Sequence, residues 1–124
     1  MKYLVTGGAG FIGSNLCESL LNKGKKVVCL DNFSTGKENN IKKLLSNNNF
    51  TLIEGDIVNF NDCEKATKEI KFIFHTAALA RVQPSIEDPI KFNEVNVNGT
   101  LNLLKAAVNN KVSRFIYSAS SSAY

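Results

Sequence analysis

Short apolar runs alternate with longer amphipathic stretches along the chain of 124 residues. A continuous apolar run bounded by turn signals is typical of a strand that is buried on both faces. Apolar residues at steps of three and four, such as Cys17, Leu20 and Leu21 after Gly13, are typical of an amphipathic helix. The strands are predicted at residues 2–6, 26–31, 50–56, 71–78 and 113–120.

This alternation predicts the fold. Strand–helix–strand units give parallel strands that are joined by right-handed crossovers. We therefore expect an α/β fold of the Rossmann type, a doubly wound parallel sheet with five strands in the order 3-2-1-4-5. Residues 1–124 contain no repeat or linker, so they are interpreted as one domain.

Two of the predicted helices carry further signals. The stretch 61–70 is interpreted as a helix with Asn61 or Asp62 as its N-cap. The longest helix is expected to begin at Asp88 and Pro89, which suit the N-cap and the first helical position. Its apolar residues form a stripe at steps of four, three and four, namely Val97, Leu101, Leu104 and Val108.

Charge and cysteine content narrow the classes of function. The net charge is +4, but the lysines are scattered among acidic residues, so no nucleic-acid partner is expected. No apolar run approaches the roughly 18 residues of a membrane span, so we expect no membrane partner and a cytoplasmic location. Cys17, Cys29 and Cys63 are then buried thiols. No metal site is predicted, and His75 is expected to be buried in the sheet and not catalytic.

The stretch VTGGAGFIGSNL contains the strongest candidate for a ligand site. Gly7, Gly10 and Gly13 follow the first strand and lead into an amphipathic helix. Glycines in this context allow a tight turn, leave no Cβ between the backbone and a pyrophosphate, and let the helix pack close to the strand. The amides at the start of the helix then face the phosphates. The loop therefore predicts a dinucleotide site.

Asp31 ends the second strand, 18 residues after Gly13, close to the spacing of about 20 expected for a ribose ligand. Its carboxylate would accept hydrogen bonds from the ribose hydroxyls and would repel a 2′-phosphate. No arginine follows to bind such a phosphate. The predicted cofactor is therefore NAD rather than NADP.

Several motifs together resemble the extended short-chain dehydrogenase/reductase family, and in particular its NAD-dependent nucleotide-sugar epimerases. The motifs are VTGGAGFIGSNL, LDNFSTG, GDI, HTAA, NVNGT and YSASSSAY, and they span the whole chain in the order of the family. LDNFSTG together with AALARVQPSIEDP looks most similar to 4-epimerases that act on UDP-glucose or UDP-N-acetylglucosamine. The resemblance thus implies a UDP-hexose as substrate.

The resemblance also implies roles for individual residues around NAD. Phe11 and Ile12 would offer amides to the pyrophosphate, Asp56 would accept from the adenine amine, and Ile57 would lie against the adenine ring. Asn96 would support the cofactor side of the site, with Gly99 allowing close approach. The other implied cofactor residues surround the adenosine ribose or follow the fourth strand, namely Asn32, Ser34, Thr35, Gly36, Ala77, Ala78 and Leu79.

At the end of the sequence, the resemblance makes Ser120 a catalytic residue that hydrogen-bonds the sugar 4-oxygen, with Ser121 and Ser122 beside the substrate. The implied reaction removes a hydride from C4 and returns it to the opposite face of the 4-keto sugar. The family's base is the tyrosine of a Tyr-x-x-x-Lys pair, which this sequence lacks. The chain is therefore expected to be the N-terminal portion of a longer enzyme, inactive alone, without the later strands and the substrate domain.

Other functions stay open. Sugar 4,6-dehydratases need an acid and a base where this chain has Ser121 and Ser122, which makes dehydration an unfavoured interpretation. A decarboxylase or reductase of nucleotide sugars is compatible with the same half of the fold. So is a non-catalytic module that binds NAD as a sensor or scaffold. A homodimer is compatible with the full-length protein.

Overall fold

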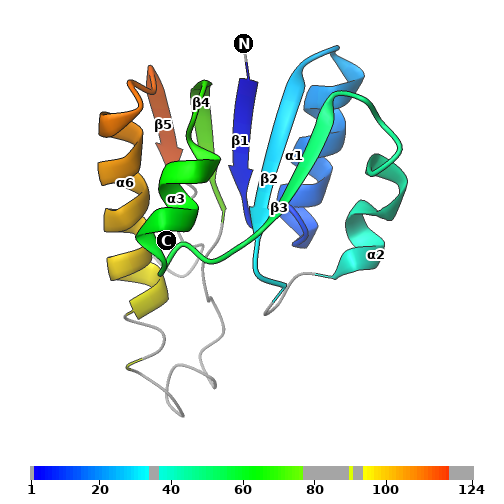
Figure 1. Cartoon of the computed structure of the whole chain (residues 1–124). Coiled ribbons are helices and arrows are strands. Elements are labelled where there is room, and N and C mark those ends of the chain that lie inside the picture. Colours follow the sequence, from blue (N-terminus) through cyan, green and yellow to red (C-terminus); the bar gives the residue numbers. More distant parts are fainter. Residues whose placement is uncertain (1, 34–36, 77–89, 91–93, 118–124) are drawn as a thin grey trace, which may run out of the picture.

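The computed structural model describes residues 2–33, 37–76, 90 and 94–117 (Figure 1). Within these residues five strands form one parallel sheet in the order β3-β2-β1-β4-β5. This confirms the predicted fold class and strand order. The strands are β1 (Lys2–Thr6), β2 (Lys26–Asp31), β3 (Phe50–Glu54), β4 (Ile70–His75) and β5 (Arg114–Tyr117).

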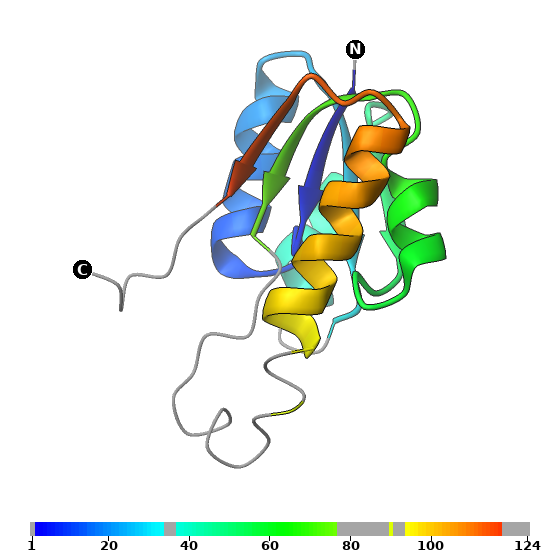
Figure 2. The same cartoon turned by 90° about the vertical axis from the view of Figure 1, so that its left-hand side faces the viewer.

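Helices cover both faces of the sheet, as a doubly wound fold requires (Figure 2). One face is covered by α1 (Phe11–Asn22) and by the short α2 (Glu38–Ile41), which continues as the 3₁₀ turn η1 (Lys42–Leu44). The other face is covered by α3 (Phe60–Ala66) and α6 (Thr100–Asn109). A π-helical segment, η2 (Glu94–Gly99), leads directly into α6.

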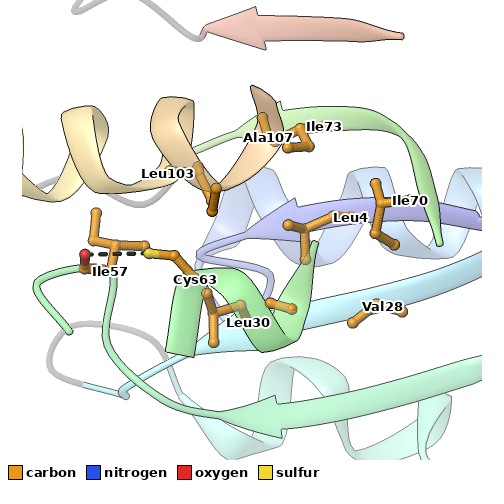
Figure 3. Packing of buried hydrophobic residues seen from close by; sticks show 11 residues of the cluster. Leu4, Val28, Leu30, Ile57, Cys63, Ile70, Ile73, Leu103 and Ala107 are labelled. Carbon is orange, nitrogen blue, oxygen red and sulfur yellow. Dashed lines mark hydrogen bonds between the residues drawn. The ribbon is translucent and has the colours of Figure 1, made fainter. Parts of the chain in front are cut away.

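Alternate side chains of each central strand enter two separate cores, because successive side chains of a strand point to opposite faces. Val5, Val27 and Cys29 pack under α1 and α2. Leu4 and Leu30 pack under α3 and α6, in one cluster with Cys63 of α3 and with Leu103 and Ala107 of α6 (Figure 3). All three cysteines are buried and free, as expected.

The N-cap of α3 lies two residues before Asn61 and three before Asp62, the two predicted caps. The N-cap is Asn59, whose Oδ1 accepts from the backbone N–H of Asn61 at 2.9 Å and of Asp62 at 3.4 Å. The predicted caps therefore lie inside the first turn. Asn59 escaped notice because an asparagine that follows a strand is equally compatible with a loop.

The apolar stripe predicted on the last helix does not face the sheet. Val97, Leu101, Leu104 and Val108 have exposed fractions of 48%, 59%, 39% and 78%. The buried face of α6 consists of Leu103, Ala106 and Ala107. The two alanines let the helix axis approach α3 closely, and the Thr67 hydroxyl reaches the Ala106 carbonyl at 3.4 Å. Close approach decides which face is buried here, although the other face is more apolar.

Candidate dinucleotide-binding site

The predicted site residues that the structure describes gather at the carboxyl edge of the sheet. Gly7 follows β1, Asp31 ends β2, and Asp56 follows β3. Asn96 belongs to η2, which is tied to the end of β4 through Thr100 and His75. Ligands of open α/β sheets bind in the crevice outside the carboxyl ends of the strands, so this edge is the expected place for one.

The glycine loop brings β1 and α1 into close contact. A Cβ on Gly13 would lie 2.1 Å from the Gly7 carbonyl oxygen, which is backbone and has no room to move. Gly10 is the N-cap of α1 and makes no side-chain capping bond, and its own N–H donates to Gly7 O at 3.0 Å. The three glycines therefore form a bare, compact turn.

The first turn of α1 follows this loop directly and carries exposed residues. The helix begins at Phe11, and Phe11 and Ile12 have exposed fractions of 79% and 64%. Amides in the first turn of a helix have no intrahelical acceptor and carry the positive end of the helix dipole. This arrangement can bind a phosphate group with backbone atoms alone.

Asp31 is held by the backbone on both of its oxygens. Its Oδ2 accepts from Ala9 N at 2.9 Å, and its Oδ1 accepts from Phe33 N at 2.7 Å. The residue is only 8% exposed. The carboxylate thus links the glycine loop to the end of β2 in one orientation. Each carboxylate oxygen accepts more than one hydrogen bond, so the ribose hydroxyls proposed as ligands have acceptors available.

Asn32 and Asp56, predicted from different motifs, contact each other. Asn32 Nδ2 donates to Asp56 Oδ2 at 3.1 Å. Asp56 Oδ1 accepts from Val58 N at 3.0 Å, and its backbone N–H donates to Asp62 Oδ2 at 2.9 Å. The ends of β2 and β3 therefore share one polar surface beside Asp31.

Ile57 follows Asp56 and is part of the hydrophobic core. Its side chain is buried, with 4% of the residue exposed, and packs in the core with Cys63 and Leu103 (Figure 3). Its carbonyl accepts from Cys63 Sγ at 3.2 Å and Asn102 Nδ2 at 3.1 Å. The expected contact of Ile57 with an adenine ring stays a prediction. Burial raises the pKa of Cys63 to about 12, so this thiol is a donor and not a nucleophile.

Several supporting residues were not predicted from the sequence. Asn40 Nδ2 donates to Ala9 O at 2.8 Å and holds the glycine loop from α2. Asn102 donates to the carbonyls of Ile57 and Val58, at 3.1 and 2.9 Å. Side chains that bond to backbone carbonyls have no periodic spacing, so only a surplus of asparagines on helices could have indicated them.

His75 is buried at the same edge, as expected, with 2% of the residue exposed. Burial lowers the pKa of this imidazole to about 4, so the ring is neutral at pH 7. It contacts hydroxyl groups on β1 and α6. Among the described residues, the hydrogen-bond partners of both ring nitrogens are hydroxyl groups, and neither is a charged group that would make His75 an acid or a base toward a ligand.

The remaining predicted site residues lie outside the described residues. They belong to the loop after β2, the segment after β4 and the end of the chain, namely Ser34, Thr35, Gly36, Ala77, Ala78, Leu79, Ser120, Ser121 and Ser122.

A model of the NAD dependent epimerase/dehydratase family matches residues 3–124 of the sequence. The chain belongs to this family. Membership confirms the resemblance seen in the motifs, and it confirms NAD as the predicted cofactor at the level of the family.

Curated members of the family catalyse more than one reaction. The chain is 38% identical to a UDP-glucose 4-epimerase of Klebsiella pneumoniae, with 100% of the chain and 92% of the relative covered. It is also 38% identical to UDP-glucuronic acid decarboxylase 1 of Arabidopsis thaliana, where it covers 27% of the relative and is itself covered completely. Sequence identity therefore does not separate epimerase from decarboxylase.

Solved structures of the family share the fold. The UDP-glucose 4-epimerase of Thermus thermophilus, in complex with NAD, matches with a TM-score of 0.82 and 40% identity, over 93% of this chain and 36% of that one. DesIV of Streptomyces venezuelae, a dTDP-glucose 4,6-dehydratase with NAD bound, matches with a TM-score of 0.88 and 34% identity, over 93% and 38%. The chain spans less than two fifths of either protein.

Neither a membrane span nor a metal cluster is found in the part of the chain that the structure describes. None of the helices described is both long and apolar enough to cross a bilayer. Within residues 2–33, 37–76, 90 and 94–117, no three His, Cys, Asp or Glu side chains gather as a metal site would require.

Proposed function

We propose that the chain is the NAD-binding domain of an enzyme that inverts C4 of a UDP-hexose. The observation that carries the proposal is the fixed carboxylate of Asp31, held by Ala9 N and Phe33 N beside the glycine loop that leads into the first turn of α1. The relatives from Klebsiella and Thermus, both UDP-glucose 4-epimerases, support the choice of reaction and of substrate.

The described residues fit the proposed cofactor. The first turn of α1 offers backbone amides to a diphosphate, and the loop before it has no side chain that would block the approach. Asp31 would bind an unphosphorylated ribose, and the paired Asn32 and Asp56 would meet the adenine. When bound, NAD would accept a hydride from C4 of the sugar and return it.

The roles of the chain's own residues follow from these positions. The backbone of α1 binds and orients, while Asp31 selects against a 2′-phosphate by its charge. For the substrate side we propose Ser120 as a hydrogen-bond partner of the sugar 4-oxygen, with Ser121 and Ser122 beside it. Because the sequence contains no Tyr-x-x-x-Lys pair, we expect these 124 residues alone to bind NAD without turning over a UDP-sugar.

The test is a comparison of dissociation constants for NAD and NADP by calorimetry. The unaltered chain should bind NAD more tightly than NADP, and Asp31→Asn should weaken NAD binding by about tenfold or more, since a charged hydrogen bond contributes roughly 1.5–3 kcal/mol. Glu18 is a carboxylate on α1 that pairs with Lys43 at the surface, and Glu18→Gln is the matched control, which should change neither constant. Equal binding of NAD and NADP by the unaltered chain would contradict the assignment.

A second candidate, decarboxylation of a UDP-uronic acid, is favoured by one observation. The Arabidopsis decarboxylase and the Klebsiella epimerase are equally similar to the chain, each being 38% identical over the whole of this chain. An assay of the full-length protein separates the two reactions. Formation of UDP-galactose from UDP-glucose supports the epimerase, whereas release of CO₂ from UDP-glucuronate supports the decarboxylase.

A further inference from the structure

A chain of hydrogen-bonded polar groups crosses the carboxyl edge of the sheet and centres on the buried His75, the last residue of β4. Its Nδ1 lies 2.6 Å from the hydroxyl of Thr6, which ends β1. Its Nε2 lies 2.8 Å from the hydroxyl of Thr100, which begins α6. One imidazole therefore joins two elements that are far apart in the sequence.

The direction of each hydrogen bond follows from the partners. The Thr100 hydroxyl donates to Asn96 O at 2.9 Å, because a carbonyl only accepts. Its proton is then in use, so His75 Nε2–H must donate to Thr100 Oγ1. A neutral imidazole has one N–H, so Nδ1 accepts from the Thr6 hydroxyl. Thr6 Oγ1 in turn accepts from Thr76 N at 3.2 Å.

This chain of hydrogen bonds ends on a segment with unusual geometry. Asn96 belongs to the π-helical η2, and π-helical turns are rare and often occur at functional sites. On its other side η2 is fixed by Gly99, where a Cβ would lie 2.6 Å from Ile57 Cγ1. The turn of η2 that contains Asn96 (the Asn96 turn) is thus held between the loop after β3 and the end of β4.

The order of the strands indicates which part of a dinucleotide η2 would meet. In the proposed binding of NAD, Asp31 and Asp56 would hold the adenosine over β2 and β3, and the loop between β1 and α1 would hold the pyrophosphate next to them. The other half of the molecule then extends past β1, toward β4 and the Asn96 turn. Thr6 directly precedes Gly7, so the hydrogen-bond chain runs from the phosphate loop to that turn.

We infer that His75 is a positioning residue: through Thr100 it holds the Asn96 turn of η2 at the nicotinamide end of the dinucleotide site. The inference depends on the proposed binding of NAD. A purely structural role, in which His75 only fills space against Phe115 and Tyr117, uses the same packing but makes no distinction between the two halves of the ligand.

Thr100→Val tests this with two ligands, because valine keeps the shape of threonine and removes the hydroxyl. Calorimetry gives the dissociation constants of NAD and of ADP, which has the adenosine and the diphosphate but no nicotinamide riboside. We expect Thr100→Val to weaken NAD binding by about three- to tenfold, the effect of one neutral hydrogen bond. The dissociation constant of ADP should stay within about twofold of its value in the unaltered chain. Thr100→Ser, a separate variant that keeps the hydroxyl, should bind NAD as the unaltered chain does.

Thr67→Val is the matched control. Thr67 is a buried threonine whose hydroxyl, like that of the half-buried Thr100, donates to a backbone carbonyl. Its acceptors are the carbonyls of Cys63 at 3.0 Å and of Ala106 at 3.4 Å, and it lies between α3 and α6. This change should lower the stability of the fold and leave the ratio of the NAD and ADP constants unaltered. If Thr100→Val does not fold, His75→Asn keeps an acceptor near Thr6, loses the donor to Thr100, and should show the same selective loss.

The outcomes separate the inference from the proposed function. If the unaltered chain binds neither NAD nor ADP, the proposed function fails. If it binds both, but Thr100→Val weakens them equally or weakens neither, the positioning role is wrong and the NAD-binding function stands. NAD binding no tighter than ADP binding in the unaltered chain also overturns the inference, since η2 would then add nothing to the site.

Discussion

Asp31 and His75 are buried polar side chains at the same edge of the sheet, and each satisfies its hydrogen bonds differently. Asp31 receives backbone N–H groups on both oxygens. His75 hydrogen-bonds two hydroxyl groups, neither of which carries a charge, so burial favours its neutral form. The edge therefore combines a carboxyl group held by the backbone with a neutral ring held by hydroxyl groups.

The pH dependence of stability should show the state of His75. Burial lowers the pKa of this residue to about 4, whereas its ordinary value of 6.5 applies to the unfolded chain. Between these two values the unfolded state binds more protons, so the free energy of unfolding rises with pH. The contribution, on the order of 3 kcal/mol, is complete above pH 6.5 and is lost as the pH falls toward 4.

Urea unfolding at a series of pH values between 7 and 4 measures this dependence. His75→Gln removes the single histidine of the chain and should flatten the curve between pH 6.5 and 5, above the range where carboxylates titrate. A slope in the variant as steep as in the unaltered chain would contradict the assignment to His75.

At the scale of elements, α6 has two apolar faces, and only one of them is buried. Leu103 is fully buried in the core above β1 and β4, while Leu101 is 59% exposed. The hydrophobic pattern alone favoured the exposed stripe, because it contains larger side chains. The alanines on the buried face carry little hydrophobic signal, although they permit the close approach that fixes the helix.

Alanine substitutions at these two leucines should therefore have unequal effects. Leu103→Ala should lower the free energy of unfolding by about 2–5 kcal/mol, because it leaves a cavity in the core. Leu101→Ala should change it by less than about 0.5 kcal/mol, as expected for an exposed position. Equal losses, measured by urea unfolding at pH 7, would mean that α6 is rotated from the orientation described.

The sequence predicted the elements better than it predicted their ends and their contacts. The order of the strands followed from the alternating pattern and from the rule for right-handed crossovers, and the glycine loop was evident from its spacing. The cap at Asn59, the support from Asn40 and Asn102, and the buried Ile57 depend on which backbone groups meet in space. No periodic pattern of residues encodes those meetings.

On the scale of the whole molecule, two cores are separated by a single sheet. The strands β1 and β2 contribute side chains to both cores, alternating along their length. A substitution that weakens the packing on one face therefore also weakens the strands that form the core on the other face. The site at the carboxyl edge depends on both cores, because α1 belongs to one and η2 with α6 to the other.

This arrangement predicts one cooperative unfolding transition. Leu21→Ala on α1 and Leu103→Ala on α6 should each lower the same midpoint, since either change weakens the common sheet. Far-ultraviolet circular dichroism and the fluorescence of tyrosine, including Tyr3 in β1, should report coincident curves. Two separate transitions in either variant would show that the faces unfold independently.

The single imidazole has a practical consequence for spectroscopy. A nitrogen-15 NMR spectrum of the histidine ring would contain signals from His75 alone, so no assignment is needed. The hydrogen bonds described predict an unprotonated Nδ1 and a protonated Nε2, and the two kinds of nitrogen resonate far apart. The labelled ring of His75 thus reports on the carboxyl edge of the sheet, and it can be followed while NAD is added to the unaltered protein.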